Sequence, residues 1–580
     1  MGDIQIKKST EKYDVIIVGS GAGGGMAGYV LAKAGVKVLM LEAGPFFDPA
    51  KDSKQLQWPW QSPRRGASVT RAFGDFDGAY GGWQIDGEPY TLKDDTEFTW
   101  FRSHMLGGRT NHWGRISLRM GPHDFKGKTF DGATDDWPIS YDDVKPYYDK
   151  VDRLIGVYGT VEGLENDPDG IFLPPPAPRL NEIFIMQGAK KAGVKVIPGR
   201  GSVLTKPLPG NNDRGACFFC GQCNRSCKAY ADFSSSSCLV IPAIKTGNLK
   251  VIPNAMVREV VVGKDGLAKG VSYISKDDMM EYQVNAGIVI LAASACSSAR
   301  ILLNSKSTTH PNGLANSSGI IGKYLHDSTG AGMSGILPQL LDRKRYNEDG
   351  VGSAQILGPW VLDNKKLDFP RGYHIEFGGG MRMPSYGFGS NVPVVNGILP
   401  GRDGKMKDAG GFGKSLKDDY RRFYGANVGM SGRGMAIARE SNYCEIDPNV
   451  VDKYGIPVLR FYYKWTDAEI KQAKHMQETF ESIMHAMGAI ITSKPAGKED
   501  NYGLHTPGDI IHEVGTARMG DDPKTSALNK WCQAHDCKNL FVTDGAPFVQ
   551  QGDKNPTWTI LALSMRTSEY IIDQIQKKNL

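Results

Sequence analysis

The chain has 580 residues, which is too long for one compact hydrophobic core and suggests two or more domains. With 40% hydrophobic and 23% charged residues, the composition is that of a soluble globular protein, and no run of about 18 apolar residues predicts a membrane span. The net charge of +6 is small for this length and no strip of Lys and Arg occurs, which argues against a nucleic-acid partner.

The first readable segment, residues 13–44, predicts a strand, a helix and a second strand. Val15–Val18 form a short apolar run, and Val36–Leu41 form another that ends at Glu42. Between them, three glycines have G-x-G-x-x-G spacing: Gly19, Gly21 and Gly24. Such glycines let the backbone approach a pyrophosphate at the helix N-terminus, and the acid can bind a ribose hydroxyl. The alternative is a Gly-rich turn in an ordinary α/β protein, and the flanking strands favour dinucleotide binding.

Further along the chain, apolar patterns predict a series of strands and helices. We expect strands in 247–262, 372–380 and 457–465, a strand and then a helix in 287–305, an amphipathic helix over 468–488 and a C-terminal helix over 557–575. Residues 121–210 are mixed, and the Pro-rich stretch 173–180 suggests an extended connector.

Four cysteines lie close together in Cys-x2-Cys-x2-Cys-x3-Cys spacing: Cys217, Cys220, Cys223 and Cys227. A structural zinc site usually pairs two short Cys knuckles across a longer loop, whereas one compact loop is close to the ferredoxin-like pattern around an iron–sulfur cluster. Disulfides between such near neighbours would constrain the chain little. The spacing therefore favours an iron–sulfur cluster over zinc, and zinc over disulfides. The remaining cysteines, Cys238 included, have no ligand role in this interpretation.

Several segments, in this order, resemble the glucose–methanol–choline (GMC) family of FAD oxidoreductases. The matching segments are GSGAGGG and LEAG within 19–44, LGGRTNHWGR (106–115), and residues 289–305, 319–328, 512–520, 540–549 and 555–564. Ser328 stands where the family usually has His. The resemblance covers nearly the whole chain and is weakest at 340–430.

The resemblance implies an α/β fold, α+β overall, in which a Rossmann-like FAD-binding domain is interleaved with a substrate-binding domain on an antiparallel sheet. The FAD-binding domain would comprise 1–50, 95–120, 230–330 and 505–580. The substrate-binding domain would comprise 51–94, 121–210 and 331–504, and residues 211–230 would form the Cys-rich, cluster-binding loop.

The resemblance also implies a catalytic pair, His512 and Asn555, facing the flavin N5. Oxidation of an alcohol needs its hydroxyl proton removed while the carbinol hydrogen leaves as hydride. An imidazole near its unperturbed pKa is a suitable base at neutral pH, and an amide can hold the hydroxyl in line. The structural alternative is that His512 caps a turn and Asn555 belongs to a simple Asn-Pro turn. Substrate contacts are expected from 330–500, where the strand at 372–380 could present Glu376 or His374.

Other family positions are expected to touch the FAD. Besides the glycines and Glu42, they are Gly108, Asn111, His112, Trp113, Val257, Asp544, Gly545, Ala546, Pro556 and Thr557. Val257 matches the position at the adenine, and Asp544 to Ala546 match the ribityl–pyrophosphate region. His112-Trp113 also resembles the pyranose oxidases, which attach FAD covalently through this His. Covalent attachment at His112 and a noncovalent His near the flavin edge both stay open.

The family's iron–sulfur sugar dehydrogenases carry three ligating cysteines with the spacing of Cys217, Cys223 and Cys227, and Cys220 is a candidate fourth ligand. Three-iron and four-iron clusters both fit this pattern. The resemblance is strongest to bacterial glucoside 3-dehydrogenases. It implies an FAD-dependent dehydrogenase that oxidises a secondary sugar hydroxyl at C3 and passes electrons through the cluster. The expected partners are a small subunit and a cytochrome-type acceptor.

Two other activities are alternatives: a pyranose-type oxidase that uses oxygen, and a gluconate or pyranose 2-dehydrogenase. The N-terminus passes directly into a strand and shows no export signal of its own. We therefore expect either a cytoplasmic enzyme or a periplasmic one that is exported together with a signal-bearing partner.

Overall fold

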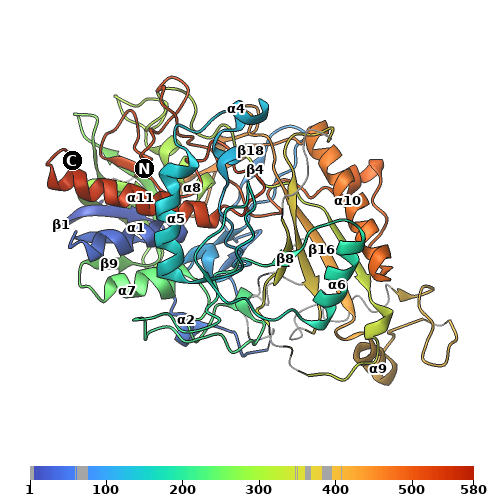
Figure 1. Ribbon diagram of the computed structural model, residues 1–580. Helices are drawn as coiled ribbons and strands as arrows, with labels where there is room; N and C mark the ends of the chain where they lie inside the picture. The colour runs from blue at the N-terminus through green and yellow to red at the C-terminus, as the bar shows by residue number, and fades with distance from the viewer. Residues whose placement is uncertain are drawn as a thin grey trace.

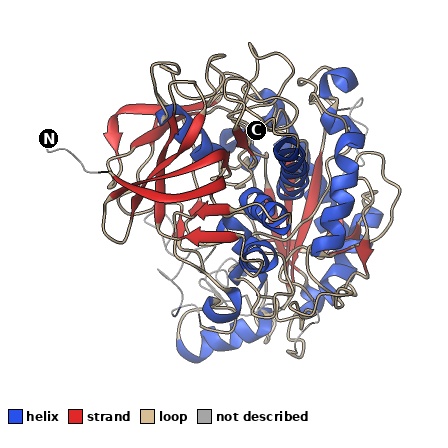
Figure 2. Ribbon diagram, turned by 90° about the vertical axis from the view of Figure 1, so that its left-hand side faces the viewer, coloured by secondary structure: helices blue, strands red, loops and turns tan. Residues whose placement is uncertain are grey.

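The computed structural model describes residues 6–58, 61, 76, 78–346, 348, 350–359, 367–381, 395–406 and 408–580. Figure 1 shows two sheet-based parts side by side, one with the N- and C-terminal elements and one with α6, α10 and β16. Figure 2 faces the first part and shows its strands beside a group of helices.

The large sheet has seven strands: β1 (Lys7–Val18), β2 (Val38–Leu41), β9 (Leu249–Ile252), β10 (Ala255–Val262), β11 (Ala268–Ser275), β12 (Glu281–Leu291) and β20 (Leu540–Val542). Their order is β10-β11-β12-β1-β2-β9, and β20 pairs with the end of β12. β1 is parallel to β2 and β12, and β2 is parallel to β9, whereas β10, β11 and β12 form an antiparallel meander. The parallel strands therefore end at one edge, which is where α/β sheets bind ligands.

Continuous apolar runs form the parallel strands because helices cover the sheet. α1 (Ala22–Lys33) and α8 (Ala295–Asn304) contact its strands, α11 (Thr557–Gln576) packs on α1, and α5 (Tyr141–Ile155) packs on α11. A Cβ on Gly28 of α1 would lie 2.7 Å from Leu249 Cδ1 and 2.9 Å from Met40 Cε. Glycine at this position therefore lets α1 approach the sheet closely.

The second sheet has six strands in the order β19-β13-β16-β15-β14-β8, all with antiparallel neighbours. They are β8 (Ile197–Pro198), β13 (Gly332–Ile336), β14 (Ile356–Gly358), β15 (Tyr373–Gly379), β16 (Asn427–Gly434) and β19 (Ile490–Ile491). Two helices, α6 (Leu180–Lys191) and α10 (Asp467–Met487), share a buried apolar core with this sheet. A capping box of Thr466 and Glu469 starts α10, and Gly488 ends it in a left-handed conformation.

Short elements complete the fold. β17 (Tyr443–Val451), β18 (Pro457–Tyr462) and β4 (Thr91–Leu92) form a three-stranded sheet, and β3 (Gly81–Gly82) pairs with β5 (Arg102–Ser103), as β6 (Val157–Tyr158) does with β7 (Phe172–Leu173). The remaining α-helices of the described residues are α2 (Pro49–Asp52), α3 (Pro122–Phe125), α4 (Gly127–Asp131), α7 (Ile241–Ile244) and α9 (Gly413–Phe423).

The long periodic patterns predicted their elements well: the helix expected over 468–488 is α10, and that over 557–575 is α11. The helices within 121–210 were missed, and the two long ones are α5 and α6. Pro146 lies inside α5 and masked its helical pattern, although Ser140 and Asp143 form a capping box there. α5 joins the core of the large sheet, although 121–210 was assigned to the substrate-binding domain, so the domain boundaries stay a prediction. Within the described residues, no helix combines the length and apolarity that a bilayer span requires.

Candidate active site

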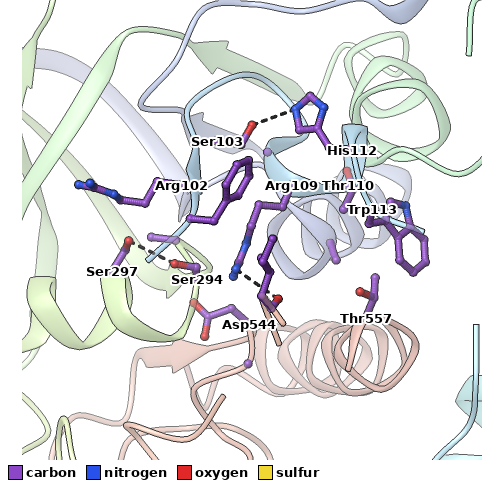
Figure 3. Close-up of a pocket in the computed structure, with 18 of the residues that line it drawn as sticks. Arg102, Ser103, Arg109, Thr110, His112, Trp113, Ser294, Ser297, Asp544 and Thr557 are labelled. Carbon is purple, nitrogen blue, oxygen red and sulfur yellow. Dashed lines mark hydrogen bonds between the residues drawn. The ribbon is translucent and has the colours of Figure 1, made fainter. Parts of the chain in front are cut away.

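A cavity of about 620 Å³ lies at the edge where the parallel strands end. Its walls come from the Gly-rich turn after β1, the 106–115 loop, the 510–513 segment, β15 and β16 of the second sheet, and the start of α11. In Figure 3, His112 and Trp113 lie on one side of this space and Asp544 and Thr557 on the other. The volume suits a large organic cofactor together with a small substrate.

The Gly-rich turn has the conformation that a pyrophosphate site needs. Gly19 has a φ of +93°, and a Cβ on Gly21 would meet nothing within 4 Å, so this backbone is open to the cavity. The free N–H groups at the start of α1 follow directly. Gly24 does not line the cavity. A Cβ there would lie 2.0 Å from the Gly19 carbonyl oxygen, so its role is to close the turn.

Glu42 lines the cavity at the end of β2 but also braces the turn. Its carboxylate accepts hydrogen bonds from the Ser20 backbone N–H at 3.2 Å, the Ser20 hydroxyl at 2.5 Å and the Gly44 N–H at 2.9 Å. Burial raises the pKa of Glu42. The position fits the expected ribose contact, which stays a prediction.

The 106–115 loop places Gly108, His112 and Trp113 against the cavity. Asn111 lies behind the loop instead, where its amide donates to the carbonyls of Leu106 at 2.8 Å and Gly108 at 3.1 Å. Asn111 therefore shapes this loop.

His112 is buried and makes contacts with both of its ring nitrogens. Nδ1 is 3.3 Å from the Asn224 carbonyl and Nε2 is 3.1 Å from the Ser103 hydroxyl. Because a carbonyl only accepts, Nδ1 carries the proton and Nε2 keeps its lone pair. Burial lowers the pKa of His112 to about 3, so the ring is neutral. The Nε2 lone pair faces the Ser103 hydroxyl, and covalent and noncovalent contact of this neutral imidazole with the flavin both stay open.

The remaining expected cofactor positions come from three different elements. Val257, Asp544, Gly545, Pro556 and Thr557 line the cavity. Ala546 does not, and its N–H donates to Asp544 Oδ1 at 2.8 Å. Burial raises the pKa of Asp544 to about 6, and the Ser298 hydroxyl donates to this carboxyl group at 2.5 Å. The three expected positions that do not line the cavity, Gly24, Asn111 and Ala546, therefore support residues that do.

The expected catalytic pair is brought together in the same cavity. Asn555 Nδ2 lies 3.3 Å from His512 Nε2 and 3.2 Å from Glu376 Oε1. A carboxylate only accepts, so Glu376 fixes the orientation of the amide, and the amide nitrogen donates to His512. Nε2 of His512 therefore keeps its lone pair. Asn555 Oδ1 is buried and has no hydrogen-bond partner within the described residues, which leaves it able to accept from a substrate hydroxyl.

The pKa of His512 differs from our expectation of a value near that of free imidazole. Burial lowers the pKa of His512 to about 3, and the positive charge of Arg433 is the second largest cause. The sequence could not show this, because the burial comes from several distant segments. The ring therefore stays neutral over the physiological pH range. It is a weak base, and it can take a hydroxyl proton only as the departing hydride makes that proton acidic.

Two charged side chains of the second sheet also line the cavity: Glu376 on β15 and Arg433 on β16. Arg433 Nη2 is 3.4 Å from Glu376 Oε2. Burial by itself would raise the pKa of Glu376, but Arg433, His374 and Asn555 hold it well below its usual range. His374 lies behind, 2.6 Å from the Asp553 carbonyl through Nδ1. Sequence reasoning named Glu376 and His374 as candidates but missed Arg433, whose signal is a lone cation in the Gly-rich strand NVGMSGRG.

The four clustered cysteines form one loop: Cys223 and Cys227 are buried, and Cys217 and Cys220 are half-buried. Gln55 Nε2 is 3.0 Å from Cys220 Sγ and 3.7 Å from Cys227 Sγ. Burial, together with the neighbouring thiols of Cys227 and Cys220, raises the pKa of Cys217 to about 12. Such protonated thiols are unsuited to act as free nucleophiles.

No group of three or more His, Cys, Asp or Glu side chains among the described residues is arranged to hold a single metal ion. An iron–sulfur cluster is larger than one ion, so its thiolates stand farther apart. Backbone N–H groups already point at two sulfurs: Phe219 N is 3.3 Å from Cys217 Sγ, and Gly352 N is 3.4 Å from Cys223 Sγ.

The cysteine loop borders the cavity as well. Gly221, Gln222, Asn224 and Arg225 are among the lining residues, and Asn224 accepts the hydrogen bond of His112. The loop that carries the cysteines and the loop expected over the flavin are therefore in direct contact.

Comparison with known proteins agrees with this geometry. Family models described as GMC oxidoreductase match residues 13–329 and 438–564. The chain is 29% identical over 579 residues to 2-methyl-1,2-propanediol dehydrogenase from Mycolicibacterium austroafricanum, covering 97% of this chain and 96% of that protein. It is 26% identical to the fructose dehydrogenase large subunit from Gluconobacter japonicus, covering 99% of this chain and 100% of that one.

A solved structure of formate oxidase from Aspergillus oryzae RIB40 superposes with a TM-score of 0.66 at 13% identity, over 98% of this chain and 99% of that one. The predicted α/β fold is thereby confirmed. The family and the relatives identify FAD as the cofactor and an alcohol or a sugar as the class of substrate. The chain belongs to the GMC oxidoreductase family of FAD enzymes.

Proposed function

We propose that the protein is an FAD-dependent dehydrogenase that oxidises a secondary hydroxyl of a sugar or glycoside, at C3, to a keto sugar. The observation that carries this proposal is the single cavity in which the His512–Asn555 pair meets both the expected flavin loop and the charged pair of the second sheet. FAD bound along this cavity would supply the hydride acceptor at N5. Gly19, Gly21 and Glu42 would hold its dinucleotide part.

The protein's own groups account for the proton and for the position of the substrate. The reacting hydroxyl would donate its single proton to His512 Nε2, which takes it as the hydride leaves, while the Asn555 amide N–H holds the hydroxyl oxygen in line. The nearby Glu376 carboxylate favours the imidazolium that results. Its negative charge raises the pKa of His512 and so partly offsets the effect of burial. Burial of the site keeps water from competing for the hydroxyl.

The paired charges on β15 and β16 support a polyhydroxylated substrate. Glu376 accepts hydrogen bonds and Arg433 donates them, and their side chains keep 15% and 19% exposure toward the cavity. A sugar offers neighbouring hydroxyls that can satisfy both groups at once. A plain aliphatic alcohol would leave their remaining hydrogen-bonding capacity unsatisfied in a desolvated site, which is costly.

We further infer an iron–sulfur cluster held by Cys217, Cys220, Cys223 and Cys227. Such a cluster would accept single electrons and pass them to a partner. The contact between Asn224 and His112, and the N–H groups aimed at the sulfurs, support this inference. A small subunit and a cytochrome-type acceptor are the partners we propose. We propose action in the periplasm after co-export with such a partner, or else in the cytoplasm.

A pyranose-type oxidase is the second candidate, because His112 and Trp113 line the cavity as the resemblance to those enzymes implies. In that case the cysteine loop would carry no cluster. A gluconate or pyranose 2-dehydrogenase would use the same site with a different carbon presented to His512.

An absorbance spectrum of anaerobically purified protein, recorded before and after adding trehalose, tests the proposal. Flavin bands on a broad visible background, with bleaching of the flavin by the glucoside, are expected. A flavin spectrum without the background, together with rapid hydrogen peroxide production in air, would support the oxidase instead. Analysis of the keto product identifies the oxidised carbon. Release of FAD on acid precipitation separates noncovalent from covalent attachment.

A further inference from the structure

The segment that carries His512 runs antiparallel to residues 324–328. His326 and Val514 exchange both backbone hydrogen bonds, at 3.0 and 2.8 Å. This register places Ser328 opposite His512, and in a continued ladder the His512 N–H would donate to the Ser328 carbonyl. The ladder stops here, because Ile511 has a left-handed φ of +64°.

The Asp327 side chain supplies the acceptors that the broken ladder lacks. Its Oδ1 accepts from the backbone N–H of His512 at 2.8 Å and of Ser328 at 2.9 Å, and its Oδ2 accepts from the Gly508 N–H at 2.9 Å. One buried carboxylate thus holds both ends of the turn 508–512. Burial raises the pKa of Asp327 to about 7, and the negative charge of Glu513 is the second largest cause.

Ser328 contacts the ring of the same histidine. Its Oγ lies 3.1 Å from His512 Nδ1 and accepts from Gln551 Nε2 at 2.8 Å. The Gln551 amide is oriented by the Lys554 carbonyl, which accepts from Nε2 at 2.9 Å. Since Asn555 donates to His512 Nε2, the neutral ring carries its proton on Nδ1 and donates it to Ser328.

We propose that Asp327 and Ser328 are positioning residues for His512, one holding its backbone and the other holding its ring. Together they keep the Nε2 lone pair directed at Asn555 and the cavity. The inference rests on the proposed function, because it takes His512 to be the group that accepts the hydroxyl proton. Neither residue touches the reacting atoms, so both act through His512.

The test compares Asp327→Asn and Ser328→Ala with the wild-type holoenzyme. Asn cannot accept at all three N–H groups, and Ala removes the partner of Nδ1. Asp447→Asn and Ser568→Ala are matched controls, since Asp447 accepts from the Asn449 N–H at 2.8 Å and the buried Ser568 donates to Ser564 O at 2.7 Å, both away from the cavity. The measurements are flavin content, kcat and KM with a sugar that reduces the wild-type flavin, and amide hydrogen exchange of 508–512.

We expect both variants to lose about 100-fold in kcat with KM changed far less, because a misplaced base costs rate rather than binding. Flavin content should match the wild type, and exchange at Gly508 and His512 should be faster in Asp327→Asn. A kcat within about twofold of the controls for Ser328→Ala would overturn the proposal even if the Asp327 variant does not fold.

The exchange measurement needs no substrate, so it separates this inference from the proposed function. If no sugar or alcohol reduces the wild-type flavin, the proposed function fails. Unchanged exchange of 508–512 in Asp327→Asn would then reject the anchoring role on its own.

Discussion

Asn555 Nδ2 lies 3.3 Å from His512 Nε2, and because an amide nitrogen only donates, this contact fixes the tautomer of the histidine. The lone pair of Nε2 is thereby held in the cavity without any charge on the ring. Burial keeps the imidazole neutral, so the pair is ready to take a proton from a hydroxyl that Asn555 holds in line.

Replacement of His512 by Gln should lower kcat by about 10²- to 10⁴-fold, which is the usual contribution of a general base. Gln preserves polarity but cannot take the proton. Anaerobic stopped-flow reduction of the flavin by a sugar measures the effect, with flavin content determined from the spectrum. His485→Gln is the control, since His485 is exposed on α10. Equal rates in the two variants would exclude His512 as the base.

Glu376→Gln should lower kcat/KM by about 10- to 100-fold, the value of a hydrogen bond to a charged partner of about 1.5–3 kcal/mol. The Gln amide can donate to Asn555, which frees the Asn555 amide to turn its oxygen toward His512. Arg433 also loses its partner. Steady-state kinetics over a range of sugar concentrations shows the effect. Glu445→Gln, which removes the half-buried ion-pair partner of Arg460, should change neither parameter.

Because of His326, the free energy of unfolding should fall as the pH is lowered. Burial lowers the pKa of His326 to about 4, below its ordinary value of about 6.5, so the unfolded chain binds the extra proton in this window. The wild type should therefore lose about 1.4 kcal/mol per pH unit relative to His326→Gln between about pH 6.5 and pH 4. Urea unfolding of both proteins at pH 7, 6 and 5 provides the measurement. A stability difference that does not change with pH would contradict the buried neutral state.

Cys227→Ser should abolish the broad visible absorbance and the bound iron that we propose, while the flavin bands remain. The matched control is Cys238→Ser, because Cys238 is buried nearby but lies outside the four-cysteine spacing. Iron analysis and electron paramagnetic resonance of both variants give the answer. Wild-type protein that contains no iron when purified under strictly anaerobic conditions would reject the cluster.

The sequence predicted those parts of the site that depend on local pattern. The apolar run before Gly19 and the acid at position 42 indicated the dinucleotide turn, and the chain folds that segment as β1, α1 and β2. The order of motifs also indicated that His512 and Asn555 belong together. Residue spacing within one segment predicts strands, turns and helix caps, because these depend on residues that are close in sequence.

The depressed pKa of His512, the orientation of Asn555 and the role of Arg433 were decided only by the tertiary structure. They arise where β15 and β16 of the second sheet meet the 510–513 segment and the start of α11, which are separated by up to about 180 residues. Gly24, Asn111 and Ala546 show the same limit, since each carries a family motif yet supports the cavity from behind. By itself the sequence determined which chemical groups the protein has and which local turns hold them. The desolvation of a side chain and the direction of its hydrogen bonds depend on which residues from distant segments pack against it, and so only the tertiary structure could decide them.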